Sequence, residues 1–235
     1  MEQRRIDALV AEFIGTFMLV FFIAMILAVY STAGIGYQDF AVVGLLHAFV
    51  LMMLVYTLGP ISGAHFNPAV TAALAAVRKI SGVDALGYVI VQVAGGIAGA
   101  SVCKLVVSDA GRATNYGAPA ISTPFLHGHV FTAALVEGIG AAVLVWAIMG
   151  TAIREDGPRK FAGLVIGATL GFIVMTFGPL TGAGVNPARS FGPALIAGSW
   201  SHGFGNFLIA YVVGPLVGGV FGALLYRGVA MREAE

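Results

Sequence analysis

One thirteen-residue segment occurs twice in this chain of 235 residues. Residues 57–69 read TLGPISGAHFNPA, and residues 176–188, which begin 119 positions later, read TFGPLTGAGVNPA. Most positions are identical, and most of the others exchange one apolar or hydroxyl residue for another. Chance does not produce such a match, so the chain is a duplicated unit. We expect a single domain, 1–235, made of two repeats, 1–115 and 116–235.

The composition places this duplicated unit in a membrane. Apolar residues make up 59% of the chain and charged residues only 10%, which are too few charges to cover a soluble enzyme. The net charge of +1 gives no basic surface and excludes nucleic-acid binding as a main activity. The single cysteine, Cys103, leaves no disulfide and no zinc-ligand pair, and the apolar stretches hold no catalytic constellation. We therefore expect neither an enzyme nor a cofactor or metal.

Six stretches are each long enough to cross the roughly 30 Å hydrocarbon core of a bilayer as a helix of about 20 residues. They are residues 8–30, 40–58, 85–107, 130–153, 161–180 and 204–226. The first is too long for the apolar core of a signal peptide, so we expect it to be retained. Glycines four positions apart, such as Gly214, Gly218 and Gly222, predict close packing between the helices.

The repeats are expected to have opposite orientations. Each contains three of the six stretches, and an odd number turns the second repeat upside down relative to the first. The polar segment 108–124 is predicted to link them. If the stretches alternate in direction, nine basic residues fall on one side, so we expect both termini to be cytoplasmic. These nine are Arg4, Arg5, Arg78, Lys79, Arg154, Arg159, Lys160, Arg227 and Arg232. Because both terminal tails are short, we expect the protein to lie in the cell membrane.

Each copy of the Asn-Pro-Ala sequence predicts the start of a short helix. Asparagine is a favoured N-cap, and proline suits the first helical position. A helix from Pro68 to about residue 77 is roughly 15 Å long, about half the hydrocarbon thickness. Pro187 begins a matching helix that runs to about residue 198. Neither can span the membrane alone, so we expect each to enter halfway from opposite faces, with their N-termini meeting at the centre.

The segments before these half-helices predict a water-filled path, because irregular backbone at membrane depth must be buried in protein or line a wet cavity. Their carbonyl groups would form a ladder of acceptors, which we assign to Gly63, Ala64 and His65 in one repeat and to Gly182, Ala183 and Gly184 in the other. The side-chain oxygens of Asn67 and Asn186 would cap the helices and leave their NH₂ donors facing the cavity. Such donors hold a water molecule by its oxygen, and together with the helix N-termini they interrupt proton transfer and repel cations.

The sequence resembles the aquaporin (major intrinsic protein) family over essentially its whole length. The resemblance rests on AEFIGTF at 11–17, SGAHFNPAV at 62–70, TGAGVNPARSFGPA at 181–194 and GPLVGG at 214–219. It includes the two motifs Asn67, Pro68, Ala69 and Asn186, Pro187, Ala188. The resemblance implies an all-α membrane protein with six transmembrane helices and two re-entrant half-helices. It also implies a homotetramer in the lipid bilayer, with one pore per subunit that passes water or small neutral solutes.

The resemblance further implies a selectivity constriction of four residues, which fall on His47, Val174, Ala183 and Arg189. Strict water channels of the family tend to have Phe in place of His47 and His in place of Val174. Glycerol channels tend to have Trp in place of His47, and Asp where this chain has Ser190. The set is most similar to that of tonoplast-intrinsic-type channels and of archaeal or bacterial aquaporins, a group associated with water, ammonia and sometimes urea or peroxide.

Two acids, Glu12 and Glu137, lie within apolar stretches. A buried ionisable group is a candidate for proton transfer, but the resemblance implies that each carboxylate instead accepts N–H groups from one of the broken loops, with Gln92 in a similar role. His127 and His129 precede the fourth stretch. They either line and gate the mouth of the path by titrating or belong to a solvated loop.

We expect a passive water channel that excludes protons and ions and also passes small neutral solutes such as ammonia. The alternative is an aquaglyceroporin-like facilitator of glycerol or urea. An ion-coupled transporter is disfavoured, because no acidic residue lies within six positions of either Asn-Pro-Ala motif.

Overall fold

The computed structural model describes residues 2–32 and 39–231, and this part of the chain forms helices and no strand. Six helical segments among these residues are long and apolar enough to cross a membrane. They are α1 (Glu2–Thr32), α2 (Phe40–Ser62), α4 (Gly82–Val106), α7 (Val130–Ile148) with the π-helical turn η2 (Met149–Ile153), the 3₁₀ turn η3 (Arg159–Phe161) with α8 (Ala162–Thr181), and α10 (Phe204–Leu208) with the π-helical turn η4 (Ile209–Val213) and α11 (Gly214–Ala230). The predicted six spans are confirmed, although α2 continues through Pro60 to Ser62 rather than ending at residue 58.

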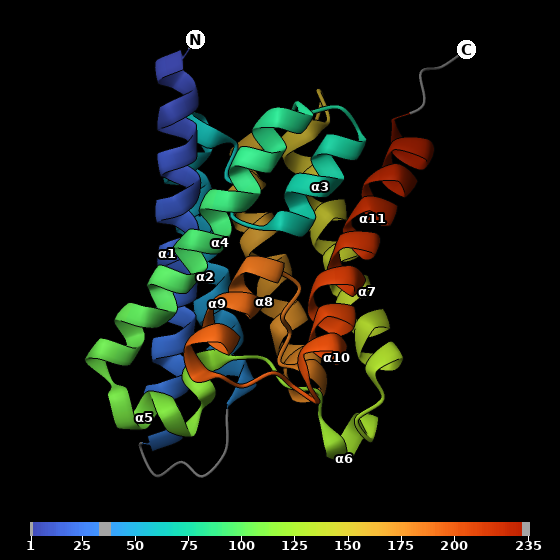
Figure 1. The fold of residues 1–235 in the computed structure, drawn as a ribbon. Coiled ribbons are helices and arrows are strands. Elements are labelled where there is room, and N and C mark those ends of the chain that lie inside the picture. Colours follow the sequence, from blue (N-terminus) through green and yellow to red (C-terminus); the bar gives the residue numbers. More distant parts are fainter. Residues whose placement is uncertain (1, 33–38, 232–235) are drawn as a thin grey trace.

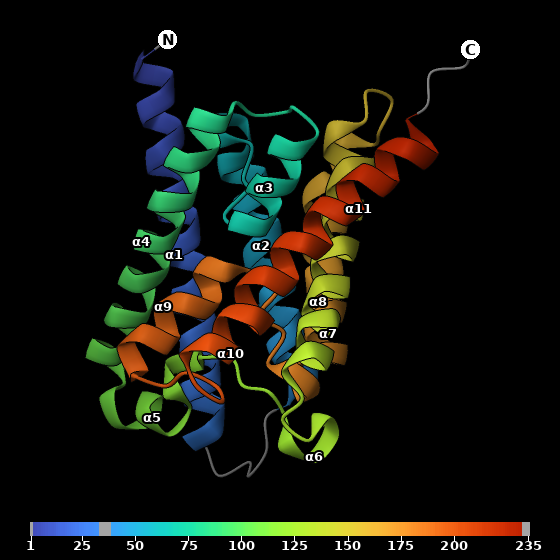
Figure 2. The ribbon, with the colours of Figure 1, turned by 45° about the vertical axis from the view of Figure 1, so that its right-hand side comes forward.

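Two further helices are too short to cross. They are α3 (Pro68–Ala76), with nine residues, and α9 (Pro187–Ala197), with eleven. Each begins at the proline of an Asn-Pro-Ala motif, as predicted. Figure 1 shows α3 in the half of the molecule that holds both chain ends and α9 in the opposite half, and Figure 2 shows the same arrangement from another side. The two half-helices therefore occupy opposite halves of one bundle.

The helices pair as an inverted repeat requires. α1 packs along α4 in the first repeat, and α7 packs along α11 in the second, while α2 and α8 pair across the two repeats. Each half-helix is held by the other repeat as well, since α3 packs on α11 and α9 packs on α4. The repeats are thus interlocked and bury their half-helices together at the centre.

The start of α1 and the last turns of α11 lie at the same end of the molecule, which we call the terminal end (Figure 1). Eight of the nine basic residues predicted for one side belong to helix ends or loops at this end, and Arg232 lies outside the described residues. The opposite end, which we call the distal end, carries α5 (Ser108–Ala113), η1 (Asn115–Gly117) and α6 (Thr123–Leu126). The segment predicted as a polar linker therefore folds into short helices.

Glycines make the close contacts within each helix pair, as their spacing predicted. A Cβ atom built on Gly218 would overlap the backbone of Gly138 on α7. The same atom on Gly99 would lie 2.6 Å from the carbonyl oxygen of Phe17 on α1. Only a residue without a side chain permits backbones to approach so closely in lipid.

We predict that Gly218→Val destabilises the protein, because the added side chain must separate α7 from α11. Overpacking of this kind costs about 1–3 kcal/mol. Thermal unfolding of the detergent-purified protein should show a lower midpoint. Gly228→Val on the same helix is the matched control, because nothing lies within 4 Å of a Cβ atom at Gly228. Equal midpoints for the two variants would contradict the prediction.

Candidate functional site

Two irregular segments precede the half-helices, and their backbones follow the same course. Left-handed φ angles occur in the first segment at Gly63 (88°), Ala64 (54°) and Phe66 (47°). They occur in the second at Gly182 (78°), Ala183 (46°) and Val185 (40°). Non-glycine residues adopt this region only when their surroundings hold them there. Each segment therefore needs partners that fix its conformation.

Glu12 of α1 supplies that support to the first segment. Its side chain is fully buried and accepts the backbone N–H of His65 at 2.9 Å and that of Phe66 at 2.6 Å. The hydroxyl of Ser62 and the side-chain amide of Gln92 also donate to it, at 2.7 and 2.8 Å. Because an isolated buried carboxylate is costly, four donors converging on one group explain why it is tolerated inside the bundle.

Glu137 of α7 is the equivalent group in the second repeat. It is also fully buried, and it accepts the backbone N–H of Gly184 at 2.8 Å and that of Val185. The hydroxyl of Thr181 donates to it at 2.5 Å. Both acids thus lie behind the irregular segments and bind their N–H groups.

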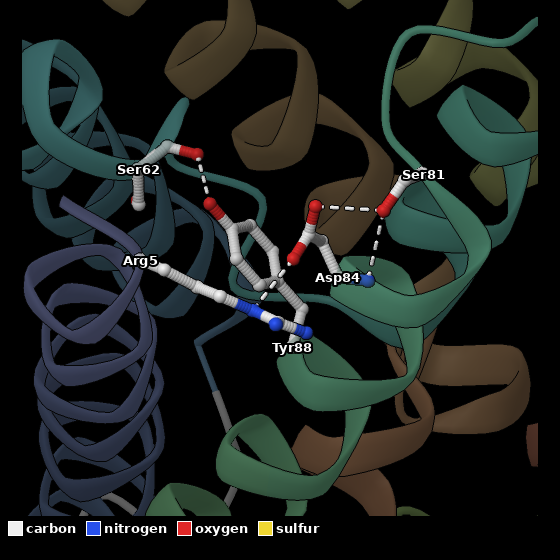
Figure 3. Close-up of polar contacts among 5 residues, drawn as sticks. All are labelled: Arg5, Ser62, Ser81, Asp84 and Tyr88. Carbon is white, nitrogen blue, oxygen red and sulfur yellow. Dashed lines mark hydrogen bonds and ion pairs between the residues drawn. The ribbon is translucent and has the colours of Figure 1, made fainter. Parts of the chain in front are cut away.

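Two buried tyrosines bind the last residues of α2 and α8, the helices that precede the irregular segments. They were not predicted from the sequence. The hydroxyl of Tyr88 donates to the carbonyl oxygen of Ser62 at 2.7 Å, and that of Tyr211 donates to Thr181 at 2.8 Å. Figure 3 shows Tyr88 beside Ser62. The signal was present in the sequence, because Ser62 and Thr181 occupy the same position of the duplicated segment and each tyrosine follows in the next span.

An ion pair ties α1 to α4 at the terminal end, close to Tyr88. Arg5 Nε lies 2.8 Å from a carboxylate oxygen of Asp84, whose own N–H is capped by the hydroxyl of Ser81 at 3.1 Å (Figure 3). Both charged side chains are largely exposed, at 51% and 40%. Exposed pairs contribute little stability, so the loop support comes from the buried groups rather than from this pair.

The carbonyl groups of the six residues predicted to form a ladder differ from the N–H groups in having no protein partner among the described residues. Within the described part of the chain, no hydrogen bond ends on the carbonyl oxygens of the six residues predicted to form a ladder. Ala64 and His65 line an inner cavity, and Gly182 lines an outer one. Each segment therefore has N–H groups bound by the protein and carbonyl groups that are not.

The two asparagines join the repeats to each other. Asn67 Oδ1 accepts the N–H of Ala69 at 2.8 Å, and its amide donates to the carbonyl of Val185 at 3.0 Å. Asn186 Oδ1 accepts the N–H of Ala188 at 3.0 Å, and its amide donates to the carbonyl of Phe66 at 2.8 Å. The expectation that both amide hydrogens stay unbound is therefore wrong. One hydrogen of each amide crosses to the other repeat, and one remains for the cavity.

Two cavities meet along this path. The inner one has a volume of about 20 Å³ and includes both asparagines and an apolar wall, for example Leu51 and Ile166. The outer one opens at the distal end and has a volume of about 410 Å³. His47 and Arg189 line both, so these two side chains lie at the boundary between the cavities, which we call the junction. Val174 lines the outer cavity, whereas Ala183 is buried and lines neither of the two.

The two shared residues present opposite hydrogen-bonding groups. His47 Nδ1 lies 2.7 Å from the carbonyl oxygen of Val43. A carbonyl only accepts, so Nδ1 carries the proton, and Nε2, buried and without a partner among the described residues, is an acceptor when the ring is neutral. Arg189 Nη1 donates to the carbonyl oxygen of Gly117 at 2.9 Å, and its Nε is buried without a partner in the same part of the chain. An acceptor and a donor thus face the junction.

The two histidines at the distal end lie apart from this path. His127 and His129 are exposed, and their ring centroids are 6.4 Å apart. Neither lines the inner or the outer cavity. Their position matches a solvated loop rather than the mouth of the path.

Six spans, two half-helices and a polar path between inverted repeats define a membrane channel. The family model described as "Major intrinsic protein" matches residues 2–226. The chain belongs to this family, whose members are channels and not enzymes.

Among its relatives is "Aquaporin AqpM" of Methanothermobacter thermautotrophicus, 40% identical, with 93% of this chain and 95% of the relative covered. Another is "Glycerol uptake facilitator protein-like 6" of Lactiplantibacillus plantarum, 38% identical, with 95% and 98% covered. The solved structure of the aquaglyceroporin of Plasmodium falciparum superposes with a TM-score of 0.83 over 96% of both chains, at 23% identity. At that identity the likeness shows the fold.

We predict that Glu137→Gln weakens the fold, because the NH₂ group that replaces one oxygen cannot accept the N–H of a loop residue. Losing a hydrogen bond to a buried charged group costs about 1.5–3 kcal/mol. The thermal midpoint in detergent should fall, and water permeability per protein should fall with it. Glu155→Gln, at an exposed position, is the matched control. An unchanged midpoint for Glu137→Gln would show that the carboxylate is not needed as an acceptor.

Proposed function

We propose that the protein is a passive water channel that excludes protons and ions and also passes small neutral solutes such as ammonia. The observation that carries this proposal is the inner cavity of about 20 Å³, which is lined by both asparagines and shares His47 and Arg189 with the outer cavity. A cavity needs about 10–15 Å³ to hold one water molecule. The path at the asparagines therefore suits molecules that move in single file.

The polar groups along the path account for the exclusion of charge. The unbound amide hydrogens of Asn67 and Asn186 and the N-termini of α3 and α9 offer donors to the oxygen of a passing water molecule. Its hydrogens then point away on both sides, toward the carbonyl ladder, and proton transfer along the file is interrupted. The positive charge of Arg189 opposes the entry of cations. In this scheme Glu12 and Glu137 hold the loops and carry no protons.

We assign selectivity to a constriction of His47, Val174, Ala183 and Arg189. His47 Nε2 accepts and the arginine donates, so a small molecule with both kinds of group can replace its lost hydration there. Val174 and Ala183 add little polarity to the constriction and leave it wider than larger side chains would. The relative named "Aquaporin AqpM" supports water as the main permeant.

Glycerol or urea transport is the second candidate, and the relative named a glycerol uptake facilitator-like protein favours it. The two candidates differ in the width of the constriction. A facilitator must admit a carbon skeleton between His47 and Arg189, whereas a water channel need not.

The assembly and its orientation complete the proposal. We propose a homotetramer, as the family resemblance implies, in the cell membrane, with repeats 1–115 and 116–235. Cytoplasmic termini are supported by the basic residues gathered at the terminal end, such as Arg78 and Arg154. The distal end then faces outward, and the constriction lies on the outer side of the asparagines.

Stopped-flow shrinkage of proteoliposomes tests the choice between water and solute. In a sucrose gradient, vesicles with the protein should shrink much faster than empty vesicles. In a urea or glycerol gradient, re-swelling should be slow, whereas ammonia entry, read from internal alkalinisation, should be fast. Re-swelling by glycerol as fast as the initial shrinkage would favour the facilitator, and shrinkage no faster than that of empty vesicles would refute a water channel.

We predict that His47→Phe lowers the permeability to ammonia and urea severalfold while sparing water, because phenylalanine removes the acceptor and narrows the opening. The same stopped-flow measurements give both permeabilities. Leu45→Phe is the matched control, because Leu45 lies on the same helix but is 47% exposed on the outer surface. If His47→Phe alters neither flux, His47 does not line the constriction.

A further inference from the structure

Three consecutive residues at the distal end have left-handed backbone: Asn115 (φ 50°), Tyr116 (φ 51°) and Gly117 (φ 81°). Glycine adopts this conformation without strain and asparagine does so at small cost, but a bulky aromatic residue rarely does. Such outliers persist only where the surroundings hold them, and they gather at functional sites. The left-handed backbone of Tyr116 therefore needs a structural explanation.

Several contacts hold Tyr116 in place. The side chain is 3% exposed, and its hydroxyl donates to the carbonyl oxygen of Ser108 at 3.0 Å. Its ring packs so closely on Gly111 that a Cβ atom there would overlap the ring. The ammonium group of Lys104 lies 5.8 Å from the ring centroid. The tyrosine thus fastens the turn η1 to α5 and to the end of α4.

The residue that follows this tyrosine holds the pore arginine. The carbonyl oxygen of Gly117 accepts Arg189 Nη1 at 2.9 Å, and Gly117 lines the outer cavity. A Cβ atom at Gly117 would lie 3.2 Å from the Cα atom of Ala24, so the turn rests against α1. Among the described residues, this backbone carbonyl is the only hydrogen-bond acceptor of the Arg189 guanidinium, and the Nε atom of Arg189 has no partner. The direction of the arginine therefore depends on this one turn.

We propose that Tyr116 is a positioning residue for Arg189 and thereby sets the solute selectivity of the channel. Its buried ring holds η1 in the left-handed conformation that turns the Gly117 carbonyl toward the arginine. When the ring is lost, the turn relaxes to ordinary backbone angles, the carbonyl moves away, and the guanidinium no longer narrows the junction with His47. This inference rests on the proposed function, in which Arg189 belongs to the constriction.

Tyr116→Leu and Tyr116→Phe in proteoliposomes test the proposal. For Tyr116→Leu we expect the ratio of urea to water permeability to rise about threefold to tenfold, as for coupled residues in one network. Tyr116→Phe loses only the bond to Ser108 and should shift the ratio less, in the same direction. Tyr226→Leu is the matched control, because Tyr226 is also buried, at 5% exposed, but belongs to the terminal end of α11. It should leave the ratio unchanged.

The same substitution combined with Arg189→Val separates positioning from a merely structural role. If Tyr116 acts through the arginine, Tyr116→Leu raises the ratio in the wild type but adds nothing in the Arg189→Val background. An equal rise in both backgrounds, or no rise for either tyrosine variant, would overturn the inference. If Tyr116→Leu does not yield folded protein, Tyr116→Phe decides in both backgrounds.

The proposed function fails in a different way. If Arg189→Val itself leaves both the urea-to-water ratio and the ion leak unchanged, then Arg189 does not form the constriction, and the assignment on which the inference rests is refuted. If Arg189→Val changes the ratio but the tyrosine variants do not, only the role of Tyr116 is refuted.

Discussion

A peptide group that leaves a helix inside a bilayer finds no partner in the lipid, so the protein or the water of a cavity must supply one. Glu12 and Glu137 meet this demand, because each accepts two consecutive backbone N–H groups of an irregular segment. The arrangement is mutual. The buried carboxylates are tolerated because donors surround them, and the left-handed backbone persists because the carboxylates hold it. Without this exchange the chain could not turn at the centre of the membrane, and the half-helices would have nowhere to begin.

The path follows from that support. Since the protein binds the N–H groups, the carbonyl groups stay unbound, and in the proposed function they and the half-helix N-termini meet the permeating molecule. The asparagines then join the halves, because each donates one amide hydrogen to a carbonyl of the opposite repeat. A cavity of about 20 Å³ remains beside them. Its wall combines the two loops with large apolar side chains such as Leu51 and Ile166.

The sequence predicts the elements of this design well and their contacts less well. Stretch length identifies the six spans, and the order Asn-Pro identifies the start of each half-helix, because both signals are local. The bonds from Asn67 to Val185 and from Asn186 to Phe66 join residues 118 and 120 positions apart, and no local pattern reveals that each amide loses one hydrogen. The fold of the distal turn is equally hidden, because the left-handed Tyr116 is held by packing and not by its own preference. The roles of Tyr88 and Tyr211, in contrast, could have been predicted from the duplicated segment.

The two repeats share one backbone scaffold but differ in the side chain three residues after the motif asparagine. The position three residues after the first motif asparagine is Val70, which lines the inner cavity, and its counterpart after the second is Arg189, which lines both cavities. Two symmetric arginines would place two uncompensated charges within the bundle, at a high desolvation cost. In the proposed function one arginine is sufficient, because molecules pass every point of a single-file path in series and a barrier to cations at one point blocks the whole route. On this proposal the duplicated backbone provides the passage, and the unmatched Arg189 provides the barrier.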